Sequence, residues 1–373
     1  QRIKDQLPQS LWVAVLLSLL VAPLCYLSPA GLPWLGIDAL TVQKSGDYIR
    51  MVAFGLPAIG IFMALRYHTQ GLGITSPFAV AAVIGFFANI PLNYVLIFGF
   101  GDIPAMGAKG CGIATAISMW LSALIITVYV LNKDSLKPYM PPWTPVAPDL
   151  PAIKNILVLG FPVGATMFLE TAVFTGIALL ISSLGDVAIG AHQIAFNVWD
   201  MFYIPMLAIG GAMATRMGHA IGAQDKAGVF RALKAGMIYS GAVSAVTMIV
   251  LLSLPHVIVS VYTQSSDMSL LAVRLLSFAA LFAMIDAVQI VGSFSMRAYK
   301  KTTFPFIASM VAYWLIALPL GYYLGIMTAN NTSDGAAGFW VGIIVGVGVA
   351  SGMIAIKLVA LLQQPIPSDL VTE

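Results

Sequence analysis

The stretch LLSFAALFAMIDAVQIVGSFSMRAYKK, residues 275–301, is an almost unbroken apolar run with one carboxylate, Asp286, near its middle. The nearest charged residues in the sequence are Arg274 and Arg297, twelve residues before and eleven after it. A helix rises about 1.5 Å per residue, so either arginine would lie about 17 Å from Asp286 along the axis. An apolar run that spans a bilayer needs about 20 residues. The stretch therefore predicts a transmembrane helix with an unpaired acid near mid-depth.

The composition of the whole chain also indicates a membrane protein. Of 373 residues, 60% are hydrophobic and 9% are charged, whereas a soluble domain carries roughly 25% charged residues. Too few polar side chains are present to cover a water-facing surface, so most of the surface is expected to face membrane lipid. The net charge of +3 is small, and we expect no nucleic-acid partner. Cys25 and Cys111 have no metal-ligand or disulfide spacing.

Apolar windows long enough to span a bilayer occur ten times. Only helices or closed barrels satisfy the backbone in lipid, and the alternation of a barrel strand is absent. The sequence thus predicts an all-α polytopic membrane protein. The expected spans are 9–29, 47–67, 77–100, 110–131, 153–183, 191–215, 231–254, 268–296, 304–327 and 337–362.

The basic residues predict the orientation. Threading ten spans places fourteen lysines and arginines on one side and four, Lys44, Arg50, Lys109 and Arg274, on the other. Basic residues concentrate in cytoplasmic loops, so both ends of this chain are expected in the cytoplasm. A cytoplasmic linker at 138–151 holds six prolines, and it would separate a four-helix lobe at 1–137 from a six-helix lobe at 152–373.

The two halves are related by an internal repeat, which is typical of transporters. A shift of 228 residues aligns landmarks of the two halves without a gap. The matching pairs are Phe54 and Phe282, Pro77 and Pro305, Pro91 and Pro319, Tyr94 and Tyr322, Gly107 and Gly335, and Gly110 and Gly338. Under this shift the helices at 153–183 and 191–215 have no partner. We therefore expect a twelve-helix protein of which the first two helices are absent here, a chain that would insert but not act as an antiporter.

Three acids fall within the expected spans. Asp286 is the first, and Glu170 lies sixteen residues from both Lys154 and Asp186. Asp200 lies nearer one end, beside Trp199 and Phe202. Ionisable groups at mid-membrane depth are costly and usually functional. An unpaired, desolvated carboxylate takes up a proton or recruits a cation, which suits an ion-coupling site. The alternative is a protonated acid that only bonds a neighbouring helix.

Weaker polar candidates lie in other spans. Gln193, Asn197, Asn89 and Asn93 could line a polar path for a substrate, or hydrogen-bond across helices as packing contacts. The sequence contains no Gly-Lys pair, and hence no phosphate-binding loop of the Walker type to power transport by ATP. These observations favour a secondary transporter, without enzymatic activity and without a cofactor, over a primary pump.

The chain resembles the multidrug and toxic compound extrusion family, in particular its bacterial NorM-like branch. The resemblance covers about residues 1–362. The stretches that carry it are FFANIPLNYVLIFG (86–99), GAKGCGIATA (107–116), LGFPVGATMFLE (159–170), GAHQIAFN (190–197), IDAVQIVGSFSMRAYKKT (285–302) and GAAGFWVGIIVG (335–346).

The resemblance implies a fold of two six-helix lobes around a central cavity in a bacterial inner membrane protein. It implies export of small organic cations or drugs in exchange for Na⁺ or H⁺, by a protein that functions as a monomer. In this branch the cation site of the second lobe uses a Glu and an Asp, matching Glu170 and Asp286; we favour Na⁺. Gln70-Gly71 stands where relatives have a Glu-Gly pair, and Asp200 looks like an addition.

Two other functions fit a chain of this class. A lipid-linked-precursor flippase of the same superfamily should need cationic residues inside its cavity, and none occurs in mid-span. A membrane scaffold or receptor without transport would use the buried acids only structurally.

Overall fold

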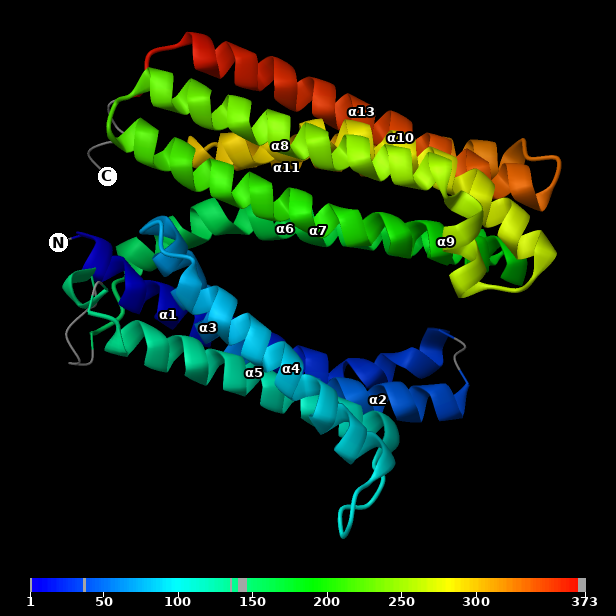
Figure 1. The fold of residues 1–373 in the computed structure, drawn as a ribbon, viewed down its shortest axis with the longest axis horizontal. Helices are drawn as coiled ribbons and strands as arrows, with labels where there is room; N and C mark the ends of the chain where they lie inside the picture. The colour runs from blue at the N-terminus through cyan, green and yellow to red at the C-terminus, as the bar shows by residue number, and fades with distance from the viewer. Residues whose placement is uncertain (1, 36–37, 135, 140–145, 368–373) are drawn as a thin grey trace. The chain divides into compact units, whose positions relative to one another are not determined.

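The structure is a computed structural model that describes residues 2–35, 38–134, 136–139 and 146–367. All regular elements of these residues are helical, apart from an isolated bridge between Phe100 and Ile103 (Figure 1). Nine helices are long and apolar enough to span a membrane, and a bent pair makes a tenth span among the residues described. The expected all-α polytopic architecture is confirmed. The chain divides into two compact units, one up to Leu157 and one from Val158 onward.

Unit 1 contains four spans. The elements are α1 (Arg2–Leu27), η1 (Ser28–Leu35), α2 (Ala39–Ala53), α3 (Leu56–Gly71), α4 (Ser76–Phe98), α5 (Gly107–Asn132) and the short η2 (Lys137–Tyr139). The span expected at 47–67 is bent, because α2 and α3 meet at an angle of 47°. Pro57, at the start of α3, has no N–H to continue the helix from α2.

Unit 2 contains the remaining spans. They are formed by α6 (Leu150–Ser182), which begins in unit 1, α7 (Asp186–Gly222), α8 (Lys226–Ser253), the short α9 (Pro255–Tyr262), α10 (Ser266–Ala298), the composite span Thr303–Met327 and α13 (Thr332–Gln363). Residues 140–145 of the expected linker lie outside the described residues. Pro151, which we assigned to that linker, instead lies in the first turn of α6, where a missing N–H leaves no bond unmade.

The internal repeat is visible in the packing of each unit taken alone. In unit 1, α5 packs on α4, and Gly110 lies directly against the carbonyl of Leu96. In unit 2, α13 packs on the composite span, and a Cβ at Gly338 would lie 2.8 Å from the carbonyl oxygen of Leu324. Leu96 and Leu324 are themselves 228 residues apart, so the same glycine-to-carbonyl contact occurs in both copies.

The copies differ in the span that follows α10 in unit 2 and α3 in unit 1. The composite span of unit 2 consists of α11 (Thr303–Met310), a π-helical turn η3 (Val311–Ala317), α12 (Leu318–Tyr322) and a second π-helical turn η4 (Tyr323–Met327). Its counterpart α4 is α-helical throughout, although it also holds a proline, Pro91. The proline therefore does not explain the π-helical turns, which occur frequently at functional sites.

Helix α10 forms the centre of unit 2. It packs against α7, α8 and α13, and Ala279, Ala283 and Ala287 are buried along it. Such small residues let membrane helices approach closely. An aromatic core formed by Phe174, Trp199, Phe282, Tyr313 and Trp340 fills the space around it. The acid of α10 is thus held within a closely packed helix bundle.

The repeated glycine contact predicts a difference between two glycines of α13. Gly338→Ala would press its methyl against the backbone of Leu324 and Gly325, whereas Gly348→Ala would meet nothing within 4 Å. Overpacking costs about 1–3 kcal/mol. We expect a clearly lower melting temperature in detergent for Gly338→Ala and an unchanged one for Gly348→Ala. Equal melting temperatures for both variants would contradict the close approach of the two spans.

Candidate functional site

Asp286 is buried in the middle of α10, with 4% of its surface exposed. Its Oδ2 atom has no hydrogen-bond partner among the described residues. The backbone beside it is fixed, because Ser351 Oγ of α13 donates a hydrogen bond of 3.1 Å to the carbonyl of Ile285. A buried oxygen without a donor is costly. The site is therefore suited to a proton or a cation at Asp286.

Glu170 extends from α6 toward the same part of unit 2. Its Oε1 atom accepts hydrogen bonds from Gln289 Nε2 at 3.2 Å and from Ser309 Oγ at 3.3 Å. Gln289 follows Asp286 by three residues on α10, and residues three apart are neighbours on a helix surface. The two acids predicted from the sequence thus reach adjacent positions along one side of α10.

A second layer supports Glu170. Gln289 Nε2 donates to Tyr313 Oη at 3.1 Å, and Tyr313 Oη donates back to Gln289 Oε1 at 3.4 Å. Gln289 and Tyr313 are both buried, and Tyr313 lies in the π-helical turn η3. Sequence analysis missed Gln289, Ser309 and Tyr313. The spacing of Gln289 from Asp286 could have identified it, whereas Ser309 and Tyr313 depend on how the composite span packs.

The salt bridges between described residues lie elsewhere. They join Lys137 to Asp134, Arg231 to Asp225 and Arg274 to Asp334. Neither Glu170 nor Asp286 takes part in one of them, as the sequence had indicated. Arg297 lies in the last turn of α10. Its guanidinium lies 4.4 Å from the ring centre of Phe294.

The third acid lies on a different surface. Gln193, Asn197 and Asp200 are all exposed on α7, and their spacing of four and three residues places them on one face. The Asn197 side chain donates to the carbonyl of Gln193 at 3.2 Å. Trp199, which precedes Asp200 in the sequence, is buried in the aromatic core. Asp200 therefore belongs to a polar stripe with Gln193 and Asn197.

The two asparagines of unit 1 join neighbouring helices. Asn89 Nδ2 of α4 donates to Ser118 Oγ of α5 at 3.0 Å, and Asn93 Nδ2 donates to Asn89 Oδ1 at 2.7 Å. Asn93 Oδ1 is buried without a partner among the described residues. This arrangement matches the packing role that we considered for them, although it leaves one acceptor unused.

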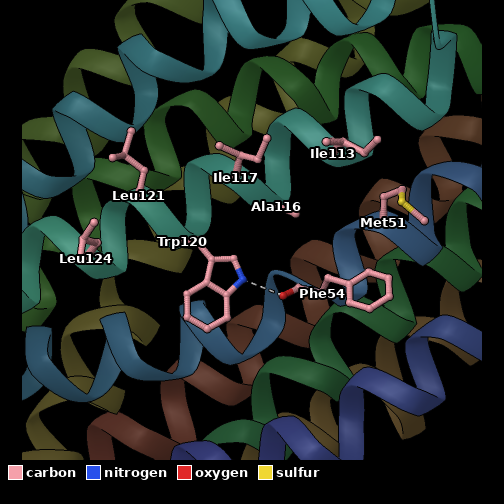
Figure 2. Close-up of a pocket in the computed structure, with 8 residues that line it drawn as sticks. All are labelled: Met51, Phe54, Ile113, Ala116, Ile117, Trp120, Leu121 and Leu124. Carbon is pink, nitrogen blue, oxygen red and sulfur yellow. Dashed lines mark hydrogen bonds between the residues drawn. The ribbon is translucent and has the colours of Figure 1, made fainter.

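Unit 1 also contains an apolar groove of about 490 Å³, shown in Figure 2. It is lined by Met51, Phe54, Ile113, Ala116, Ile117, Trp120, Leu121 and Leu124. Trp120 Nε1 donates to the carbonyl of Phe54 at 3.0 Å, and this bond satisfies a carbonyl freed where α2 gives way to α3. Phe54 is 61% exposed, whereas its counterpart Phe282 is 1% exposed beneath Trp199 of α7. None of the lining residues is ionisable, so the groove offers no ion chemistry.

Comparison with known proteins assigns the chain to a family. The sequence matches the MatE family over residues 1–95 and 162–323. The chain belongs to the multidrug and toxic compound extrusion (MATE) family. It is 35% identical to multidrug resistance protein NorM of Photobacterium profundum, over 95% of this chain and 79% of that protein. It is 32% identical to multidrug resistance protein MdtK of Edwardsiella ictaluri, over 97% and 80%.

The fold agrees with solved MATE structures. The eukaryotic MATE transporter AtDTX14 superposes with a TM-score of 0.86 at 18% identity, covering 96% of this chain and 78% of that one. The identity to NorM and MdtK proteins confirms the resemblance to the NorM-like branch. This MATE protein is a multi-pass membrane protein with the two-lobe fold of the family.

The polar stripe of α7 predicts a pattern of chemical accessibility. With Cys25 and Cys111 replaced by serine, we expect Asn197→Cys to react with a membrane-impermeant thiol reagent, because an exposed polar stripe in a span is stable only beside water. Val198→Cys should stay unreactive because Val198 is buried. Mass spectrometry of the intact membrane protein measures the labelling of both variants. Equal reactivity at the two positions, or none at Asn197→Cys, would place the stripe against lipid.

Proposed function

We propose that this MATE protein is a secondary antiporter that exports organic, mostly cationic compounds in exchange for Na⁺. The observation that carries the proposal is the unpartnered, buried Oδ2 of Asp286 beside Glu170, with no salt bridge to either acid among described residues. The NorM and MdtK names of its relatives support multidrug export.

The chemistry of the surrounding groups fits a hard monovalent cation. Carboxylate, hydroxyl and amide oxygens are the ligands that such ions prefer. Glu170 and Asp286 would hold the ion, with the hydroxyl oxygen of Ser309 within hydrogen-bond distance of Glu170. Protons would bind the same carboxylates, so H⁺ is the second candidate coupling ion. In either case the bound ion neutralises charge that the apolar interior disfavours.

The buried acids explain how an ion gradient could drive a conformational change. A ligand shifts a conformational equilibrium only by its differential affinity for the two states. An acid pair that is shielded in one state and hydrated in the other binds the cation differently in each. For exchange transport, the conformation that favours ion binding has to bind the exported compound less well. The ion then lowers the affinity for the compound by the same factor as the compound lowers the affinity for the ion. No cofactor enters this scheme.

The polar stripe of α7 is proposed as part of the path for the exported compound. Asp200 supplies a negative charge there, and Gln193 and Asn197 supply hydrogen-bonding groups along the same face. Met201 and Ile204 are also exposed nearby and add apolar surface. Such a mixture is suited to an amphiphilic cation. A lipid-linked-precursor flippase would require cationic groups to bind phosphate, and this face carries an acid instead.

The distribution of basic residues supports an orientation of the chain in the membrane. Most basic residues lie on one side of the spans, so both ends of this chain are proposed to lie in the cytoplasm. The protein would act as a monomer in the inner membrane, with lipid around it. This orientation places the N-terminal ends of α7 and α10 on the periplasmic side.

The coupling role of the two acids is tested by neutral variants of similar shape. In the full-length protein, we expect Glu170→Gln and Asp286→Asn to insert normally but to abolish efflux of a fluorescent organic cation from vesicles driven by a Na⁺ gradient. Asp134→Asn is the matched control, because Asp134 is exposed in a loop and paired with Lys137. Near-normal rates in both buried variants would assign these acids a purely structural role.

Asp200 is expected to influence substrate choice without affecting ion coupling. Asp200→Asn removes the charge of the α7 stripe while keeping its hydrogen bonding. We expect export of cationic compounds to fall severalfold relative to neutral ones, with unchanged Na⁺ dependence. The measurement compares initial efflux rates of one cationic and one neutral dye in the same vesicles. An equal loss for both dyes would instead assign Asp200 a coupling or folding role.

A further inference from the structure

Gln289 contacts the candidate ion site in a way that the proposed function leaves unexplained. Its amide nitrogen donates to Glu170 Oε1 at 3.2 Å, and Ser309 Oγ donates to the same oxygen at 3.3 Å. Two hydrogen-bond donors, the Gln289 amide and the Ser309 hydroxyl, thus stabilise the Glu170 carboxylate. A bound cation would also interact favourably with this negatively charged oxygen, and it would take the place of the donor hydrogens.

The position of Gln289 is fixed by a second contact. Tyr313 Oη forms hydrogen bonds with both ends of the Gln289 amide, at 3.1 and 3.4 Å. Gln289 is 4% and Tyr313 is 2% exposed, so water has little access to replace either bond. The amide therefore stays directed at Glu170 as long as Tyr313 keeps its place.

The place of Tyr313 depends on an unusual piece of backbone. It lies in the π-helical turn η3, which directly follows α11 and therefore Ser309. The corresponding residues of α4 are α-helical, and the position matching Asp286 in that copy is Ala58. The π-helical turn and the acid thus occur together in one copy of the repeat and are both absent from the matching described residues of the other.

We infer that Gln289, positioned by Tyr313, is an internal competitor of the coupling cation for Glu170. Its amide occupies the carboxylate in the ion-free state and has to release it when the ion binds. Gln289 is thus a positioning residue that weakens ion binding, which lets the ion leave at the end of each cycle. This inference rests on the proposed ion site at Glu170 and Asp286.

The inference predicts a gain in ion affinity on removal of the amide. Gln289→Met keeps the length of the side chain but removes the donor. A hydrogen bond to a charged group contributes about 1.5–3 kcal/mol, and part of this is lost from the ion-free state only. We expect the Na⁺ concentration for half-saturation to fall by roughly five- to tenfold. Tyr313→Phe should shift it in the same direction by less, because the amide remains but is held less firmly.

The experiment measures protection of buried carboxyl groups. The full chain, purified in detergent, is treated with dicyclohexylcarbodiimide at increasing NaCl, with choline chloride holding the ionic strength constant. Labelling is read by mass spectrometry, and loss of the label in Glu170→Gln and Asp286→Asn identifies the sites. Ser295→Ala is the matched control, since it removes a buried hydrogen bond within α10, from Ser295 Oγ to the carbonyl of Val291, that involves neither acid. Its half-protection concentration should equal that of the wild type.

The outcomes separate the two proposals. Na⁺ protection in the wild type, with tighter protection in Gln289→Met, supports the inference; general damage to packing would weaken protection instead. Unchanged or weaker protection in Gln289→Met, with wild-type protection intact, overturns the inference and leaves the ion site standing. Absence of Na⁺ protection in the wild type overturns both. If Gln289→Met fails to give monodisperse protein, Tyr313→Phe decides the question by the same criterion.

Discussion

The energetic constraint that organises this protein is an acid held inside an apolar helix, with no salt bridge to any residue that the structure describes. Asp286 is buried on α10, and its Oδ2 has no donor among the described residues. A carboxylate cannot stay ionised in such a place at an acceptable cost unless a cation joins it. The occupancy of this position by an ion or a proton therefore affects the stability of the surrounding helices. A transporter can use that dependence to link ion binding to conformation.

The scaffold concentrates this chemistry in one of two related copies. The glycine contacts at Leu96 and Leu324 recur, and they are part of the repeated fold. Asp286 in place of Ala58 does not recur, and neither does the π-helical turn that carries Tyr313. Buried Phe282 likewise replaces exposed Phe54. The repeat supplies helix packing, and the departures from it supply the candidate ion site.

The sequence was sufficient for the architecture and for the two acids. Long apolar runs specify spans because lipid leaves the backbone no other choice, and isolated carboxylates in such runs are conspicuous. The apolar sequence continues across the bend at Phe54, so the angle between α2 and α3 could not be read from it, although Pro57 marks the position. Tyr313 and Ser309 could not have been assigned from the sequence. The contacts of Ser309 with Glu170 and of Tyr313 with Gln289 depend on the packing of the composite span and on its π-helical turn. The burial of Trp199 away from Asp200 likewise required the helix to be placed against α10.

The central claim is that Glu170 and Asp286 together form a site for a monovalent cation. The most direct test is a crystal structure of the full chain in rubidium chloride, with anomalous scattering recorded at the rubidium edge. The account predicts an anomalous peak within coordination distance of a carboxylate oxygen of each acid, and its loss in Asp286→Asn. A rubidium peak in unit 2 that touches neither carboxylate, or a map with no peak at the acids, would contradict it.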